Sequence, residues 1–166
     1  MKKVIVCAAA VLFLAARSSG GAQMKIGSPS FEPGAMIPDK FTCKGLESSP
    51  EIHIEGVPAG AKSLVLIMDD PDAPMGTFVH WVVINIPPST AVIRENAAPG
   101  VEGKNSARGQ GYTGPCPPSG THRYYFKLYA LDSVLGLDGD ADKAAVEKAM
   151  KGHIIDQAEF MGRYKK

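Results

Sequence analysis

The sequence predicts a β-rich domain of the sandwich type, with its helices late in the chain. Three observations lead to this fold class. The chain has 18 glycines and 13 prolines among 166 residues, too many for a mostly helical protein. Short apolar runs alternate with clusters of turn-forming residues through most of its length. A helical repeat of apolar residues is found only in the last quarter, so the helices are expected there.

Four segments have the pattern of β-strands. Residues 51–55 alternate strictly between apolar and polar, which predicts a half-buried strand with His53 facing water. Residues 63–69 are almost wholly apolar, as in a strand covered on both faces. Residues 78–86 form the strongest strand pattern, and residues 123–131 form another.

The C-terminal quarter predicts helices followed by a last strand. Asp140 is a candidate N-cap for a helix in which alanines recur every fourth residue. A second helical stretch is expected over residues 153–158. Residues 160–164 are then expected to return as a strand.

The first 22 residues have the organisation of a secretory signal peptide. Lys2 and Lys3 precede an apolar run of 13 residues, and small residues follow up to Ala22. The run is too short to span a bilayer comfortably. We therefore expect a signal peptide over residues 1–22 and one domain over residues 23–166. Cleavage near Ala22 would make the protein periplasmic or secreted, without stable membrane insertion; the alternatives are an N-terminal anchor or a buried helix.

Charge and motifs narrow the function classes. Removing Lys2, Lys3 and Arg17 with the signal leaves 15 basic and 17 acidic residues, a formal charge of −2. This balance gives no indication of a nucleic-acid partner. The sequence contains no Walker A motif and no G-x-S-x-G motif, and a hydrolase using His80 or His122 as general base would lack an evident nucleophile. We expect no enzymatic activity and no cofactor.

Cys43 and Cys116 remain after signal removal. An even pair of cysteines in an exported protein predicts a disulfide, because the compartment is oxidising. The alternative is two buried free thiols. A bond would tie the segment before the first core strands to the loop around Cys116.

Two stiff segments are the candidate functional site. The first, residues 69–74, places three carboxylates between prolines at the end of a buried strand. The second, residues 109–124, is rich in glycine and proline and ends in His122, Arg123 and Tyr124. His122 and Tyr124 have the same parity on a strand, so their side chains are expected to share one face.

His80 lies between these segments on the strand of residues 78–86. Strict alternation places it on one face with Phe78, Val82 and Ile84, and Trp81 on the other. An Asp that accepts from one imidazole nitrogen leaves the other nitrogen facing a cavity. Two such imidazoles, with free backbone N–H groups from a Gly-Pro loop, suit a phosphate or a carboxylate.

Structural roles are the alternatives for these histidines. A histidine among apolar residues of a strand, such as His80, is commonly a structural residue with its hydrogen bonds satisfied. His53 is expected to be exposed, and His153 to begin a helix. A metal site from His80, His122 and Asp70 is chemically feasible but has no compact ligand motif, so no metal is predicted.

The same residues carry a family resemblance. Residues 69–74, 76–81 and 111–126 read DDPDAP, GTFVHW and GYTGPCPPSGTHRYYF. In this order they resemble the phosphatidylethanolamine-binding protein family, and most closely its bacterial, Raf-kinase-inhibitor-like branch. FTCKG at 41–45 also resembles the N-terminal pattern of that branch. The resemblance extends from about Lys25 to Tyr164.

The resemblance implies a sandwich of two antiparallel sheets with short helices near the C-terminus. It also implies a small anion-binding pocket at the end of the sandwich. The family's ligand-pocket positions fall on Asp70, Asp72, His80, Gly114, Pro115, His122 and Tyr124. The chain ends soon after Tyr164, so the extra C-terminal helix that flanks the pocket in eukaryotic members has no clear counterpart.

We therefore expect an exported, non-enzymatic binding protein with a small anion pocket. Its ligand would carry a phosphate-like or carboxylate head group, with phospholipids and nucleotides as candidate classes. The alternative is a protein inhibitor or modulator of a protease or kinase, acting through the rim of the pocket. The sequence makes no prediction about the oligomeric state.

Overall fold

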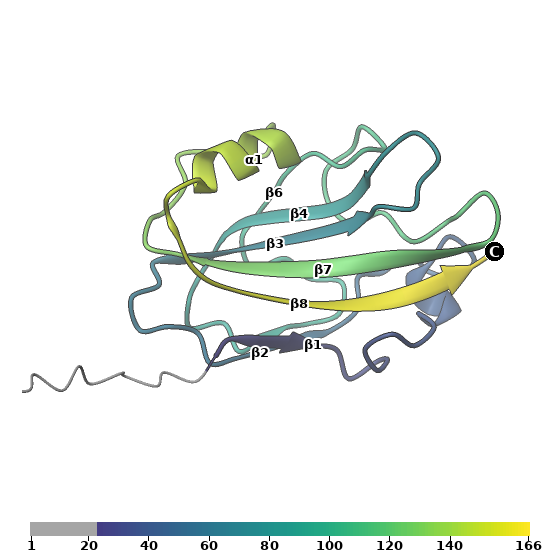
Figure 1. The fold of residues 1–166 in the computed structure, drawn as a ribbon, viewed down its shortest axis with the longest axis horizontal. Coiled ribbons are helices and arrows are strands. Elements are labelled where there is room, and N and C mark those ends of the chain that lie inside the picture. Colours follow the sequence, from purple (N-terminus) through teal and green to yellow (C-terminus); the bar gives the residue numbers. More distant parts are fainter. Residues whose placement is uncertain (1–22) are drawn as a thin grey trace, which may run out of the picture.

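Two antiparallel β-sheets pack face to face in the computed structural model, which describes residues 23–166 (Figure 1). The predicted signal peptide lies outside these described residues. The smaller sheet has the order β1-β2-β5, with bounds Lys25–Gly27, Ile52–Glu55 and Val92–Ile93. The larger sheet has the order β6-β4-β3-β7-β8, with bounds Val101–Glu102, Phe78–Ile86, Ser63–Asp70, Thr121–Leu131 and Ile154–Lys165. The predicted fold class, a mainly β sandwich of antiparallel sheets, is confirmed.

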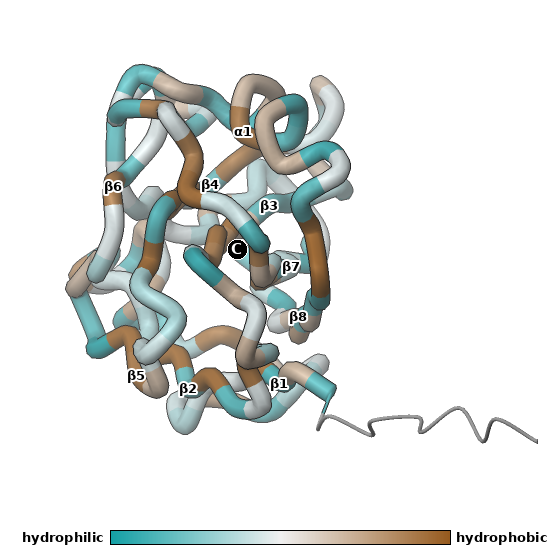
Figure 2. Tube along the Cα trace, turned by 90° about the vertical axis from the view of Figure 1, so that its left-hand side faces the viewer, coloured by the Kyte–Doolittle hydropathy of each residue, from teal (hydrophilic) through white to brown (hydrophobic). Residues whose placement is uncertain are grey.

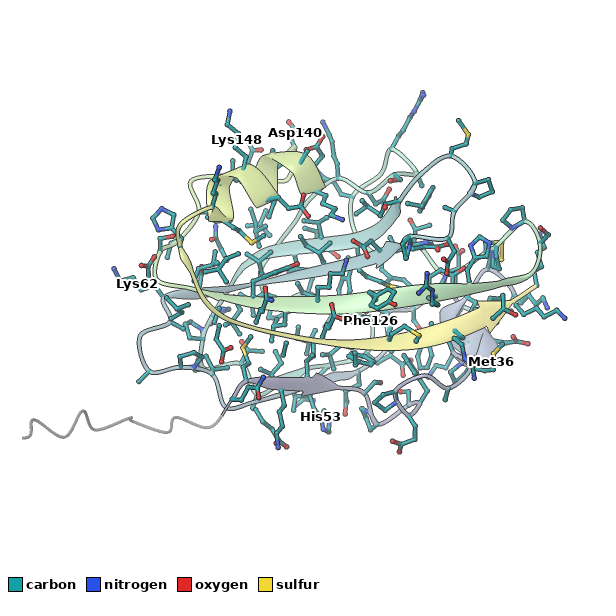
Figure 3. The ribbon with its side chains drawn as sticks, in the orientation of Figure 1. Met36, His53, Lys62, Phe126, Asp140 and Lys148 are labelled. Atoms are coloured by element: carbon teal, nitrogen blue, oxygen red, sulfur yellow. A yellow bond between two sulfur atoms is a disulfide. The ribbon has the colours of Figure 1, made fainter. Side chains whose placement is uncertain are left out.

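Four of the five strand predictions agree with the structure to within two residues, and the fifth, residues 160–164, lies inside the longer strand β8. Strand β4 has the predicted bounds, β3 is one residue longer, β2 begins at Ile52, and β7 begins at Thr121. In β2 the isoleucines are buried and His53 is exposed, so the strict alternation correctly predicted which face of the strand is exposed to solvent. Figure 3 shows His53 pointing away from the larger sheet.

The predicted helix over residues 153–158 is wrong. His153 lies in a turn, and residues 154–158 begin β8, which pairs antiparallel with β7 from Ile154, opposite Leu131, to Lys165, opposite Thr121. As a strand, the segment forms its backbone hydrogen bonds with β7. A short helix would have to form them within the segment itself. The structure has one α-helix, α1 (Lys143–Met150), and one 3₁₀ turn, η1 (Asp39–Phe41), among the described residues.

The N-cap of α1 is also different from the prediction. The side chain of Asp142, not Asp140, accepts a hydrogen bond from the backbone N–H of Ala145 at 2.9 Å. Asp140 instead forms an exposed ion pair with Lys104 at 3.0 Å. Both aspartates lie at the start of the apolar repeat, so the sequence pattern alone did not distinguish them.

The protein has two apolar cores, one on each face of the larger sheet. The first fills the space between the two sheets and includes Trp81 and Phe126. The second lies between the larger sheet and α1 and includes Val82 and Val146. Figure 2 shows the three-stranded sheet on one side of the larger sheet and α1 on the other. Strand β3 belongs to both cores and is buried along its whole length.

One end of the sandwich brings together three segments that are distant in the sequence. Strand β3 ends there, β4 begins there, and β7 begins there, because β3 pairs antiparallel with both neighbours. The C-terminus lies at the same end (Figure 1). The loops of residues 71–77 and 111–120 therefore meet at this end. Within residues 23–166, no helix has the length and apolar character needed to cross a membrane.

Candidate functional site

A cavity of about 240 Å³ lies between these two loops. Five of the predicted site residues line it: Asp70, His80, Gly114, His122 and Tyr124. The remaining lining residues are mostly apolar and come from the two loops and the start of β4: Ala73, Pro74, Phe78, Thr113, Cys116, Pro117 and Pro118. The site is therefore a small, largely apolar cavity into which a few polar groups converge.

Asp70 and His122 form a buried pair at the base of the cavity. The Nδ1 of His122 lies 2.7 Å from Oδ2 of Asp70, and the two residues are 7% and 3% exposed. An ionised carboxylate only accepts hydrogen bonds, so Nδ1 of His122 carries the proton. The other carboxylate oxygen accepts the backbone N–H of Asp72 at 2.8 Å. Both oxygens are thus engaged, and Nε2 of His122 has no partner among the described residues.

His80 reaches the same cavity through an irregularity in its strand. Met68 pairs with Trp81 while Asp69 pairs with Val79, so His80 is the extra residue of a β-bulge. The prediction that His80 shares one face with Phe78, Val82 and Ile84 is therefore wrong in part. His80 does lie on the same side as Phe78, but Val82 and Ile84 point to the other face of the sheet, into the core beneath α1. Bulges re-aim side chains in this way, and strict alternation cannot foresee them.

The tautomer of His80 follows from its partner. Its Nδ1 lies 2.7 Å from the carbonyl oxygen of Thr113, which can only accept, so Nδ1 donates. The ring also packs against Phe78 and edge-on against Tyr124, with centroids 4.8 Å and 5.2 Å away. Burial lowers the pKa of His80 below its usual 6.5. The neutral ring therefore offers its Nε2 to the cavity as an acceptor.

Tyr124 adds a polar group that is left without a partner. Its hydroxyl is buried and makes no hydrogen bond within residues 23–166. Burial, followed by the charges of Asp70 and Asp72, raises the pKa of this phenol, so the hydroxyl stays protonated. A buried, unsatisfied donor costs free energy unless something binds it. The side chain lines the cavity, where a ligand would satisfy it.

Gly114 allows the cavity wall to pack closely on its neighbour. A Cβ at this position would lie 3.0 Å from the backbone of both Phe41 and Thr42, a tight contact that glycine avoids. Pro115, also predicted as a ligand residue, does not line the cavity. It is buried beneath the loop, and its carbonyl oxygen accepts from the N–H of Cys43 at 3.2 Å.

Asp72 is the other predicted ligand residue that does not line the cavity. Its carboxylate accepts from the Arg123 guanidinium at 2.7 Å and 2.9 Å and from the Arg123 backbone N–H at 2.9 Å. The side-chain hydrogen bonds from Arg123 lower the pKa of Asp72 to about 2. Asp72 thus fastens the loop of residues 71–77 to β7 and holds Asp70 through its own N–H.

Sequence reasoning missed some residues of the site. Phe78 and Thr113 were not predicted, although both lie within the motifs that indicated the pocket. Asn105 had no sequence signal: its side-chain amide donates to the Gly111 carbonyl and to the Thr113 hydroxyl, both at 3.0 Å. This bridge from a distant loop positions the carbonyl that orients His80.

The other two histidines lie away from the cavity. His53 pairs with Glu51 and His153 with Asp132, each at 2.8 Å and on the exposed surface. Across the described chain, no group of three or more histidine, cysteine or acidic residues is arranged to hold a metal ion.

The predicted cysteine pair is bonded in the structure. Cys43 and Cys116 form a disulfide with their Cα atoms 5.5 Å apart. Cys116 is exposed and belongs to the cavity wall. The bond therefore ties the η1 segment to the loop of residues 111–120.

Comparison with known proteins gives a consistent family. The model of the family "Phosphatidylethanolamine-binding protein" matches residues 27–165. A UPF0098 protein of Aquifex aeolicus is 49% identical over 158 residues, covering 90% of this chain and 92% of the relative. A UPF0098 protein of Methanothermobacter thermautotrophicus is 45% identical over 150 residues, covering 86% of this chain and 99% of the relative.

Two crystal structures have the same fold. One, from Chlamydia trachomatis and described as a phosphatidylethanolamine-binding protein homolog, has a TM-score of 0.85 and 44% identity; the match covers 87% of this chain and 98% of that one. The other is Escherichia coli YbcL, described as a member of the mammalian family, with a TM-score of 0.81 and 28% identity over 87% and 99% of the chains. The chain belongs to the phosphatidylethanolamine-binding protein family.

Proposed function

We propose that this protein is a non-enzymatic binding protein whose end cavity holds a small phosphate-like or carboxylate head group. One observation carries the proposal: the two imidazoles, each fixed through Nδ1, line the same cavity as the unpartnered hydroxyl of Tyr124. The Nε2 atoms and this hydroxyl are the polar atoms left for a ligand. They converge from β4 and β7, which hold them rigidly.

The hydrogen-bonding roles favour an anion that also carries a proton. The Tyr124 hydroxyl donates and suits an acceptor oxygen of an anion, and the free Nε2 of His122 offers a second hydrogen-bonding position beside it. Neutral His80 accepts through Nε2 and suits a P–OH or carboxyl OH group. A hydrogen-phosphate monoester satisfies all three groups at once, whereas sulfate provides no hydrogen for His80.

The size of the cavity favours a head group over a whole lipid or nucleotide. At about 240 Å³ it is smaller than the roughly 300–1,000 Å³ of sites that enclose drug-sized ligands. A phosphate with a short substituent fits that volume. A longer chain or a nucleoside would extend past the rim prolines, Pro74 and Pro118.

The groups around the cavity support binding without catalysis. The Asp70–His122 pair resembles a general-base arrangement, but a nucleophile is needed beside it. Cys116 is bonded in the disulfide, and the Thr113 hydroxyl is held by Asn105. We infer that the protein also acts after export, in the periplasm or outside the cell, where an oxidising compartment allows its disulfide to form.

A second candidate function is modulation of another protein through the pocket rim. It is favoured by Met75, which is fully exposed in the loop of residues 71–77 beside the cavity. A partner that docked on this loop would bury that side chain. Thermal unfolding distinguishes the two functions: small anions should stabilise a ligand-binding protein in isolation, whereas a modulator acting only through its rim should not respond.

The direct test is calorimetric titration of phenyl phosphate into the wild type and two variants. His122→Ala should weaken binding by about 1–3 kcal/mol, the usual contribution of a hydrogen bond to a charged group. His53→Ala is the matched control, because His53 is exposed and remote from the cavity, and it should bind as the wild type does. Equal affinity in wild type and a folded His122→Ala would place the ligand elsewhere and favour the modulator.

A further inference from the structure

One of the two loops that line the cavity, residues 111–120, is held differently in its two halves. Several hydrogen bonds join its first half to the rest of the protein. The Tyr112 hydroxyl donates to the Phe41 carbonyl at 2.7 Å. The N–H of Thr113 donates to the His80 carbonyl at 2.9 Å, and the Pro115 carbonyl accepts from Cys43 at 3.2 Å. Residues 112–115 are therefore fixed without the disulfide.

The second half of the loop is held differently. Between residue 116 and the start of β7, no hydrogen bond to the rest of the described chain is formed. Pro117 and Pro118 have no N–H to donate, yet both form part of the cavity wall. Regular pairing resumes at Thr121, opposite Lys165. The Cys43–Cys116 bond is thus the one covalent or hydrogen-bonded tie on this stretch of wall.

We propose that the Cys43–Cys116 disulfide is a redox switch that controls the cavity: when it is reduced, residues 116–120 leave the wall and ligand affinity falls. The claim about affinity rests on the proposed function. The claim about the wall does not, because it depends only on how residues 116–120 are held.

The position of the bond makes it accessible to a reductant. Cys116 is exposed, whereas Cys43 is half-buried. A thiolate of a dithiol reductant attacks the Cys116 sulfur, forms a mixed disulfide and releases Cys43 as a thiolate, which takes up a proton. The second thiol of the reductant then displaces Cys116. The protein gains two electrons and two protons, and the reductant leaves as a disulfide.

The fold should survive this reduction. Of residues 116–120 only Pro117 is buried, and none of the five belongs to either apolar core. The Asp70–His122 and His80–Thr113 hydrogen bonds also do not involve that stretch. The polar groups of the site should stay in place while one wall becomes mobile. If the closed wall is then populated about one-tenth of the time, the apparent Kd rises about tenfold.

The experiment compares oxidised protein, protein reduced with dithiothreitol, and the double variant Cys43→Ser, Cys116→Ser. Phenyl phosphate is titrated into each by calorimetry, and amide ¹⁵N relaxation of Cys116 (Ser in the variant) and Ser119 is measured without ligand. Both forms that lack the bond should bind about tenfold more weakly. Their order parameters at 116 and 119 should fall below about 0.6.

Val146→Ala in the oxidised protein is the matched control for general loss of stability. Val146 is fully buried in the second core, far from the cavity, so its truncation lowers the melting temperature without touching the wall. Its affinity for phenyl phosphate should equal that of the wild type.

Unchanged affinity together with unchanged relaxation after reduction would overturn the switch. If neither the oxidised nor the reduced protein binds phenyl phosphate, the proposed function is wrong. In that case the ¹⁵N order parameters alone test whether the disulfide holds the cavity wall. If those at residues 116 and 119 are the same in the oxidised and the reduced protein, the proposal is refuted.

Discussion

Two histidines show how far single residues can be placed from the sequence. The shared parity of His122 and Tyr124 placed both side chains in one cavity, because β7 is regular there. The same reasoning failed for His80, since a bulge between Asp69 and Met68 shifts the register of β4. Which residue of a strand is extra depends on its partner, and the partner is not visible in a linear pattern.

The lowered pKa of His80 predicts that the protein loses stability in acid. Because burial lowers the pKa of His80 below 6.5, the unfolded chain binds more protons at this ring than the folded protein between the two values. Stability from the neutral ring is therefore complete above pH 6.5 and is lost as the pH falls below it. Urea unfolding from pH 7 to pH 4.5 should show this loss in the wild type and a smaller one in His80→Gln.

Sulfate binding should respond to acid in the opposite sense. A protonated His80 can donate to sulfate through Nε2, so affinity should rise as the pH falls through the lowered pKa of His80. The glutamine amide of His80→Gln carries its donor at every pH. Calorimetry at several pH values should thus find a weaker pH dependence in the variant, and identical profiles would show that His80 does not contact the anion.

At the scale of elements, the strands were easier to predict than the helices. Strands β3 and β4 lie between neighbours, and their long apolar runs predicted them almost residue by residue. The helix predicted over residues 153–158 was wrong because these residues lie at the start of an edge strand. The first two residues of that strand, Ile154 and Ile155, are both exposed. The alternation in burial begins only at Asp156, so the start of the strand shows no period of two in the sequence.

The N-cap of α1 provides a test at this scale. Asp142→Ala removes the hydrogen bond to the Ala145 N–H and should lower the free energy of unfolding by about 1 kcal/mol. Asp140→Ala, at the position that the sequence suggested, removes only an exposed ion pair and should cost about 0.5 kcal/mol or less. Chemical denaturation of both variants measures the two losses in the free energy of unfolding. A larger loss in Asp140→Ala than in Asp142→Ala would show that Asp140 is the N-cap.

At the scale of the whole molecule, the end of the sandwich that holds the cavity is joined by contacts between segments far apart in the sequence. The disulfide spans 73 positions, enough for about 4 kcal/mol of stabilisation in the chain-entropy model. It was predictable because the expected export predicts oxidised cysteines, and the two cysteines that follow the predicted signal peptide leave one pairing. The cavity was predictable only as a set of motifs, since its depth depends on how the loops of residues 71–77 and 111–120 meet.

The described chain also constrains where a signal peptide would be cut. Met24 is 2% exposed and belongs to the core between the sheets, and its N–H donates to Asp156 at 3.1 Å. Cleavage after Ala22 keeps this residue, whereas cleavage two residues later removes it. Intact-mass analysis of the exported protein should therefore find a chain that begins at Gln23.

Stability gives an independent check on that boundary. A chain shortened to begin at Lys25 loses the buried Met24 side chain and should be less stable than residues 23–166 by about 2–3 kcal/mol. Its affinity for phenyl phosphate should be unchanged, because Met24 is not among the residues that line the cavity. A full-length species in the membrane fraction that retains Met1 to Ala22 would instead show that this segment is an anchor.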